Sequence, residues 1–433
     1  MIRPCRTLCG VWWCAGDVLR VLAASEQRFV RHATYTGRTV RVEGELDTAA
    51  LRAAFGALLR TYPVLTCRIG EDEAGHGHLL RPSGDHVGAW VTHGEPDEVR
   101  IPAESIDPRT QLAYLDVTVA HRSRVTLYVH HAVADAGHCV ELFARLWDNY
   151  TEYVGGRSIS VVPQPYPQSL EWYAAERGIV RGERSGLEDA IRALPPGARI
   201  LPPDPEIPPP PALARPRRAV LDVETTARIV RLGRRPDVTV NGLVTAALLR
   251  AYVAETSGAA GDPVPVSCVY PVDMRSRLDP PVSAVAGTNM AGLACFAATV
   301  DPAGDIENLG AQISARLHRD LADGTVRQSV LHFPDFFGPT MIHSLAGHIA
   351  LTNTGRVRTF TMPAGSALSE YEIVYLSAHP RPSTGAAAAV TFLVYTYADR
   401  LTVGILGGGA AGDRLPEAVA KHLEALAAEP VDS

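Results

Sequence analysis

The feature that most restricts the fold of this chain is a proline-dense stretch near its middle. The sequence reads VVPQPYPQ at 161–168 and ILPPDPEIPPPPALARP at 200–216. The four prolines Pro208–Pro211 have fixed φ angles and no backbone N–H donors, so they favour an extended polyproline connector. The chain on either side is therefore expected to fold as two units, which a length of 433 residues also favours.

The first half contains alternating strand and helix patterns. Val40 and Val42 alternate with polar residues, as in a strand with one buried face. Asp47 follows as a candidate helix N-cap, and the apolar residues after it recur at helical spacing until a proline ends the run: Leu51, Phe55, Leu58 and Leu59. A further strand pattern, 124–131, leads into a second helix pattern at 140–154.

The second half repeats this alternation. A short helix is expected between the two proline clusters, at 169–178. A strand and helix follow at 217–232, and a strongly apolar helix at 239–255. Near the end, two strands flank a turn at 398–400, and a final helix is expected at 415–428.

These patterns predict a mixed α/β protein of two lobes. The N-terminal lobe is assigned to 22–165 and the C-terminal lobe to 216–433, joined by a helix and proline-rich connector at 166–215. Residues 1–21 are expected to be a leader outside the fold, disordered or mis-assigned, because glycines and an aspartate interrupt its apolar residues.

Composition excludes several classes of protein. The net charge of −6 argues against a nucleic-acid partner, which requires a basic surface. No apolar run is long enough for a membrane span. The seven cysteines are odd in number and contain no C-x-x-C pair, so we expect reduced thiols in the cytoplasm. We expect a monomer.

The stretch RVTLYVHHAVADAGHCVELF carries the most distinctive chemistry. Its two adjacent histidines, His130 and His131, stand at the end of a strand, and Asp135 follows just before an apolar helix. Because side chains alternate along a strand, the two imidazoles face opposite sides of the sheet. Small residues between them and the helix, which starts near Gly137, keep the approach to His131 open.

Three interpretations fit this pattern. His131, Asp135 and His138 could converge on zinc if the loop folded back, although strand alternation disfavours this. The histidines could be packing residues at a strand end. Alternatively, one histidine is a base beside the unpaired N–H groups of a helix N-terminus, as acyl transfer requires.

The segment HHAVADAG resembles the HHxxxDG signature of the acyl-thioester-dependent acyltransferases, which include chloramphenicol acetyltransferase and the condensation domains of peptide synthetases. Further segments resemble, in order, the polyketide-associated acyltransferases typified by phthiocerol dimycocerosyl transferase: LAASEQRF, LRTYPVLTCRI, AERGI, PVDMRSRL, LTNTGRV and VYTYADRLTV. The resemblance spans about residue 22 to the C-terminus. It implies two chloramphenicol-acetyltransferase-like lobes in a V-shaped pseudo-dimer, with the motif inside a tunnel at their interface.

The resemblance also implies roles for individual residues. His131 is the expected general base, and His130 is expected to orient the loop. Asp135 is expected to hold the loop through an arginine, for which Arg275 is the candidate. This sequence departs from the family pattern at Ala136, since its glycine is displaced to Gly137, and the pocket beside the helix is expected to differ there.

A segment expected to cross between the lobes supplies candidate tunnel residues, namely Asn353, Gly355 and Arg356. No cofactor or metal is expected, because the donor carries its acyl group on the phosphopantetheine thiol of an acyl carrier protein or of coenzyme A. The acceptor is expected to be a small-molecule alcohol or amine.

Three functions remain open at this point. The favoured one is an O-acyltransferase that forms an ester in polyketide-type specialised metabolism. The second is a free-standing condensation enzyme that forms an amide, although TNTGRV stands where those domains carry a D-F-G-W-G motif. The third is a non-catalytic relative that binds a carrier protein.

Overall fold

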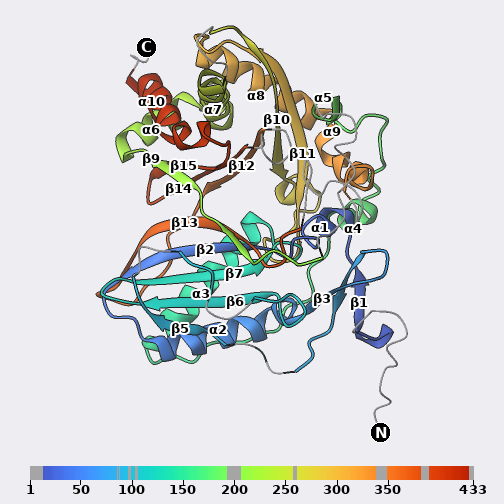
Figure 1. Cartoon of the computed structure of the whole chain (residues 1–433), viewed down its shortest axis with the longest axis vertical. Coiled ribbons are helices and arrows are strands. Elements are labelled where there is room, and N and C mark those ends of the chain that lie inside the picture. Colours follow the sequence, from blue (N-terminus) through green and yellow to red (C-terminus); the bar gives the residue numbers. More distant parts are fainter. Residues whose placement is uncertain are drawn as a thin grey trace.

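The computed structural model describes residues 13–84, 86, 88–95, 99–102, 106–192, 206–256, 261–337, 349–381 and 390–428. Within these ranges the chain forms two six-stranded sheets, one above the other in Figure 1, and a three-stranded sheet beside the lower one. The mixed α/β class expected from the sequence is confirmed.

The lower sheet has the strand order β5-β6-β7-β2-β13-β8. These strands are β5 (Trp90–His93), β6 (Ala113–Val119), β7 (Ser123–His130), β2 (Thr34–Glu43), β13 (Ala367–Ser377) and β8 (Ala212–Ala214). The apolar residues Val125, Leu127 and Val129 of β7 face a core shared with helices α2 (Thr48–Thr61) and α3 (Ala136–Val154). Tyr128 joins a smaller cluster on the opposite face, as alternation requires.

The upper sheet has the order β11-β10-β12-β14-β15-β9. Its strands are β11 (Ala291–Val300), β10 (Val264–Asp273), β12 (Ile349–Arg356), β14 (Val390–Tyr397), β15 (Arg400–Gly407) and β9 (Arg217–Val220). It packs with helices α6 (Val223–Leu232), α7 (Val240–Thr256), α8 (Ile306–Ala322) and α10 (Leu415–Ala428) around the second large core (Figure 1).

The described residues also form shorter helices and strands. They are η1 (Ala15–Asp17), β1 (Val18–Val21), α1 (Ala24–Gln27), η2 (Pro63–Thr66), β3 (Arg68–Glu71), β4 (Gly77–Leu80), α4 (Leu170–Glu176), α5 (Glu188–Arg192), η4 (Arg275–Arg277), α9 (Thr325–Gln328), η5 (Ser329–Asp335) and η7 (Ala411–Asp413).

Several elements agree closely with the sequence patterns. Asp47 caps α2 by accepting hydrogen bonds from two backbone N–H groups, as its position before an amphipathic run predicts. Ser169 caps α4 in the connector in the same way. The strands β14 and β15 form the expected hairpin, and Ala398 and Asp399 at its turn have positive φ angles.

Strand β13 corrects the sequence-based lobe boundaries. It belongs to the segment 216–433 assigned to the C-terminal lobe, yet it pairs antiparallel with β2 of the N-terminal sheet. In Figure 1 the orange strand β13 lies beside the blue strand β2. The connector strand β8 pairs with β13 at the edge of the same sheet. The division at 216 thus separates strands that form one sheet.

The expected leader is also partly wrong. Residues 15–21 form η1 and β1, and β1 pairs antiparallel with β4. Residues 1–12 lie outside the described part of the chain.

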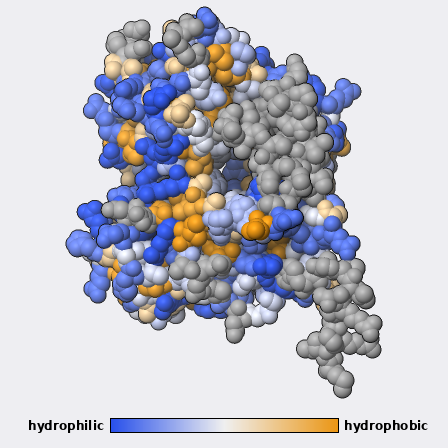
Figure 2. All heavy atoms as spheres, viewed as in Figure 1, coloured by the Kyte–Doolittle hydropathy of each residue, from blue (hydrophilic) through white to orange (hydrophobic). Residues whose placement is uncertain are grey.

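The two large sheets meet through aromatic side chains. The Tyr395 hydroxyl on β14 donates a hydrogen bond of 2.9 Å to the backbone carbonyl of Tyr371 on β13. Phe360 and Tyr397 pack against Tyr371 with ring centroids 6.0 and 5.2 Å away. Figure 2 shows hydrophobic residues gathered at the middle of the molecule, beside a hollow between its upper and lower halves.

Candidate active site

The two adjacent histidines lie where β7 ends. His130 is the last residue of the strand, and its fully buried ring meets the edge of Tyr35 at 4.9 Å. Its Nδ1 accepts a hydrogen bond from the backbone N–H of Ala132, 3.2 Å away. His130 therefore shapes the turn that follows, and burial lowers its pKa to about 3.

His131 faces the opposite side of the sheet. Its half-buried ring stacks on Phe29 at 3.9 Å with an interplanar angle of 11°, and lies 6.1 Å from the ring of Tyr375. Its Nδ1 is 3.1 Å from the carbonyl oxygen of Ala134. Because a carbonyl only accepts, Nδ1 carries the proton and Nε2 keeps a free lone pair. Burial and the nearby Arg28 guanidinium lower the pKa of His131 to about 4, so the ring is a neutral base at neutral pH.

Asp135 caps helix α3 and joins two distant parts of the chain. Its carboxylate accepts hydrogen bonds from the backbone N–H groups of His138, at 3.1 Å, and Met290, at 2.9 Å. The Arg275 guanidinium binds it with Nη1 to Oδ2 at 2.7 Å. Burial alone would raise the pKa of Asp135, but Arg275 and the backbone donors hold it below its usual range. The pair expected between Asp135 and Arg275 is formed.

A segment that no sequence pattern indicated holds the turn from the other side. The carbonyl of Thr288 accepts the N–H of Asp135 at 3.1 Å. The Asn289 side-chain amide donates to the carbonyls of His131, at 2.7 Å, and Ala132, at 3.2 Å. The residues 287–290, which precede β11, thus fix the backbone on which His131 is mounted.

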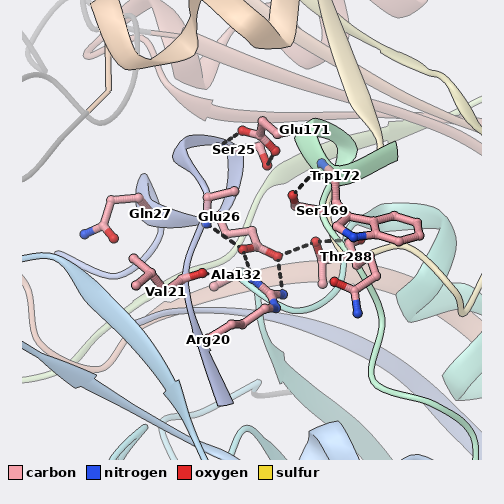
Figure 3. A network of polar contacts seen from close by, with 12 residues as sticks. Arg20, Val21, Ser25, Glu26, Gln27, Ala132, Ser169, Glu171, Trp172 and Thr288 are labelled. Atoms are coloured by element: carbon pink, nitrogen blue, oxygen red, sulfur yellow. Dashed lines mark hydrogen bonds and ion pairs between the residues drawn. The ribbon is translucent and has the colours of Figure 1, made fainter. Parts of the chain in front are cut away.

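This segment is in turn held by the N-terminal part of the chain. Figure 3 shows the fully buried Glu26 of α1 accepting a hydrogen bond of 2.6 Å from the Thr288 hydroxyl. Arg20 binds the same carboxylate with both terminal nitrogens. Beside it, Ser25 donates from its backbone N–H and its hydroxyl to Glu171 of α4, at 2.8 and 2.7 Å. The network ties α1, which leads into Phe29, to the segment that supports His131.

The candidate tunnel residues have partners in the upper half of the fold. Asn353 on β12 donates to the side chain of Asn241 on α7 at 3.2 Å, and accepts from the N–H of Gly355. Arg356 is exposed and pairs with Asp399 at the β14–β15 turn. These three residues lie on β12 of the upper sheet, whereas β13 is the later strand that joins the lower sheet, and a place in the tunnel remains a prediction for them.

Gly137 lies exposed in the first turn of α3. A Cβ placed there would have only ordinary contacts, with Arg275 Nη1 at 3.6 Å and Asp135 Oδ1 at 3.7 Å. Packing around this position therefore does not require glycine. A surface hollow of about 740 Å³ lies elsewhere, on α2, and its lining includes Phe55 and Leu59 but not His131.

The three side chains of the zinc hypothesis have separate partners. Asp135 binds Arg275, His138 Nδ1 lies 3.1 Å from the carbonyl of Gly287, and His131 Nδ1 donates to Ala134. Among the described residues, no three His, Cys, Asp or Glu side chains are grouped to hold a metal ion. Within the same ranges, no helix combines the length and apolar character needed to cross a membrane.

Known proteins are similar to this chain in sequence and in fold. Residues 210–406 match the family model described as "Phthiocerol/phthiodiolone dimycocerosyl transferase C-terminus". A phthiocerol/phthiodiolone dimycocerosyl transferase of Mycobacterium sp. (strain JLS) is 34% identical over 357 residues, which cover 81% of this chain and 84% of that protein. The chain belongs to this family of acyltransferases. The family resemblance seen in the sequence is thereby confirmed.

Solved structures agree. The structure of polyketide synthase associated protein 5 from Mycobacterium tuberculosis is 28% identical, with a TM-score of 0.78, and the match covers 95% of this chain and 99% of that one. The first condensation domain of the CDA synthetase is 16% identical, with a TM-score of 0.63 and coverage of 96% and 97%. This second likeness shows the fold alone.

Proposed function

We propose that this acyltransferase moves an acyl group from a phosphopantetheine thioester to the hydroxyl of a small-molecule acceptor, forming an ester. The observation that carries the proposal is the state of His131. Its Nδ1 is committed to the Ala134 carbonyl, its pKa is about 4, and Nε2 is left as an unprotonated acceptor. A base in this state takes a proton from a hydroxyl without first losing one itself.

The reaction then needs no covalent enzyme intermediate. As His131 Nε2 removes the hydroxyl proton, the acceptor oxygen attacks the thioester carbonyl and forms a tetrahedral oxyanion. The carbon–sulfur bond breaks, the thiolate leaves, and the proton on Nε2 returns to the sulfur. Asp135 and Arg275 act as positioning residues, because they hold the loop and contact no reacting atom.

The names of the relatives support the class of substrate. Dimycocerosyl transferases and a polyketide synthase associated protein align over most of this chain at 28–34% identity, so we place the enzyme in polyketide-type lipid or specialised-metabolite biosynthesis. We propose that the donor is an acyl carrier protein, with coenzyme A as a weaker substitute, and that both substrates approach through a tunnel between the two sheets. We further propose that the protein is a monomer. We also propose that it lies in the cytoplasm, which four buried free thiols support: Cys67, Cys139, Cys268 and Cys295.

Intact-mass measurement of a loaded carrier protein tests the proposal. With wild-type protein and an alcohol acceptor, the acyl mass should leave the carrier and appear on the acceptor. His131→Ala should slow this transfer about 10²–10⁴-fold while remaining folded. Full transfer by a folded His131→Ala variant would show that another group is the base.

The preference for a carrier is tested by comparing kcat/KM for the same acyl group on carrier protein and on coenzyme A at two ionic strengths. Basic residues around the entrance would mainly raise the association rate, so the preference for the carrier should shrink as the Debye length falls below about 8–10 Å. Equal values at low salt would identify a coenzyme-A-dependent enzyme.

A further inference from the structure

Arg38 on β2 is a buried cation that, among the described residues, has no carboxylate in contact with it. Its side chain is 1% exposed, and it donates to the hydroxyl of Thr36 at 2.6 Å and to the carbonyls of Gly37, at 3.3 Å, and Ala136, at 3.5 Å. All three acceptors are neutral, and Nε has no hydrogen-bond partner. Within the described part of the chain, no carboxylate lies within 4 Å of its guanidinium.

Two other buried arginines pair with carboxylates. Arg275 holds the carboxylate of Asp135, and Arg124 holds that of Glu372 at 3.3 Å. A fully buried guanidinium is normally paired, because removing its charge from water is costly unless an anion compensates. Arg38 has no such contact within the described residues, and the charge of Asp135 acts on it without an ion pair.

The surroundings of Arg38 favour an anion. Ala136, whose carbonyl Arg38 approaches, is the first residue of the 19-residue helix α3, whose partially positive N-terminus is capped by the Asp135 carboxylate. Tyr371 of β13 lies on the same face of the sheet, and its buried hydroxyl also has no hydrogen-bond partner. A guanidinium and a spare hydroxyl donor together suit a carboxylate.

The same face of the sheet leads to the catalytic histidine. His131 donates its backbone N–H to the carbonyl of Thr34, and Thr36 and Arg38 follow on the same side of β2. Tyr375, which pairs with Thr36 in the sheet, is partly exposed and lies 6.1 Å from the His131 ring. At about 3.3 Å per residue, Arg38 stands roughly 13 Å along the strand from Thr34, and its guanidinium turns back toward Thr36.

We infer that Arg38 binds the carboxylate of a substrate whose reacting end lies at His131, with Tyr371 as a second donor. This inference rests on the proposed function, which defines the reacting end. The carboxylate belongs either to the acyl chain of the donor or to the acceptor. The phosphate of the phosphopantetheine arm is too far from the thioester to occupy this position once the thioester is at His131.

Isothermal titration calorimetry with matched probes tests the inference without turnover. In the donor arm, adipoyl-coenzyme A is compared with heptanoyl-coenzyme A. In the acceptor arm, 6-hydroxyhexanoate is compared with 1,6-hexanediol. We expect wild-type protein to bind the carboxylate at least tenfold more tightly than the neutral partner in one arm, and that arm identifies the substrate.

Variants assign the preference to the site. Arg38→Met should abolish it by weakening only the carboxylate probe, Arg38→Lys should keep part of it, and Tyr371→Phe should weaken the carboxylate probe about two- to tenfold. Arg41→Met is the matched control on the same strand, because Arg41 faces the other side and pairs with Glu370. Equal affinities in both arms, no saturable binding of either carboxylate, or a loss of preference in Arg41→Met would overturn the inference.

Stability gives a second readout. If Arg38 binds a substrate anion, Arg38→Met should melt at or above the wild-type temperature in the absence of ligand, since it removes a buried charge that no carboxylate contacts. Destabilisation as large as that of Arg275→Met would make Arg38 a structural residue. A carboxylate preference without acyl transfer from any thioester would refute the proposed function and leave the anion site standing.

Discussion

Asp135 and Arg275 are 140 residues apart in the sequence, and the 2.7 Å contact between their side chains joins the loop after His131 to the segment after β10. The Asp135 carboxylate also accepts hydrogen bonds from the backbone N–H groups of His138 and Met290. It therefore fixes the start of α3 relative to the start of β11. The position of His131, the proposed base, therefore depends on packing between the two sheets.

Removing this carboxylate should damage the fold more than removing the base. We expect Asp135→Ala to lower the free energy of unfolding by about 3–5 kcal/mol, because it leaves a buried guanidinium unpaired. His131→Ala should cost clearly less. Asp273→Asn is the control, since Asp273 also contacts Arg275, at 3.3 Å, but is 60% exposed. Urea unfolding measures all three, and equal losses for Asp135→Ala and His131→Ala would contradict a structural ion pair.

The pH dependence of activity should report a depressed histidine. The pKa of His131 is about 4, so Nε2 stays unprotonated until the pH falls toward that value. The acid limb of kcat/KM should therefore lie near pH 4, where an ordinary histidine would place it near 6.5. A limb near pH 6.5 would show that His131 is charged more easily than its buried position implies.

Stability should also fall in acid. His130, His131 and His138 have pKa values of about 3, 4 and 4 in the fold because burial disfavours the charged ring, whereas the unfolded chain takes up protons near 6.5. The unfolded state thus binds more protons between about pH 6.5 and 4, so the free energy of unfolding decreases as the pH falls through that window. Urea titrations at several pH values measure the slope. His138→Asn should reduce the number of protons taken up on unfolding by about one, and the slope should decrease accordingly. An unchanged slope would show that His138 does not contribute to the pH dependence.

Glu372 should be a second site of high sensitivity. Its fully buried carboxylate binds Arg124 of β7 at 3.3 Å, Arg215 at 2.8 Å and Arg218 of β9 at 3.0 Å. Glu372→Gln leaves these cations without their anion, and we expect a loss of about 3–5 kcal/mol. The matched control is Glu370→Gln on the same strand, whose carboxylate is 40% exposed, for which we expect at most about 1 kcal/mol. Thermal melts compare the two, and similar losses would contradict a special role for the buried carboxylate.

Chelators should leave the rate unchanged. Asp135 and His138, which the zinc hypothesis requires, have Arg275 and the Gly287 carbonyl as partners. We expect the same kcat/KM after dialysis against EDTA, and no stoichiometric zinc by elemental analysis. Activity that is lost with EDTA and restored by zinc would establish a metal site.

Local patterns predicted the elements that local physics determines. The cap at Asp47, the turn at Ala398–Asp399 and the helix α10 depend on neighbouring residues, and all three stand where the sequence placed them. The alternation of β7 likewise separated His130 from His131 correctly. Each of these is a short-range relationship, visible as spacing along the chain.

Relationships between distant segments could not be seen in this way. Nothing in the composition of β13 distinguishes a strand that joins the upper sheet from one that joins β2. No sequence pattern indicates the hydrogen bond from Asn289 to the carbonyl of His131. The same is true of the hydrogen bond from Thr288 to Glu26. Arg275 was identified only because the family resemblance required an arginine partner for Asp135.

The pairing of β13 with β2 of the N-terminal sheet constrains how the chain folds during its synthesis. While the ribosome has released only the first 200 residues, β2 is paired with β7 on one side and has an open edge on the other, because its second partner is not yet synthesised. An open strand edge recruits other strands, including those of neighbouring nascent chains. The first sheet must therefore remain unfinished until residue 377 emerges. If the gene were divided at the proline connector, each of the two fragments should aggregate when it is produced alone. The lower sheet should form fully only when both fragments are produced together.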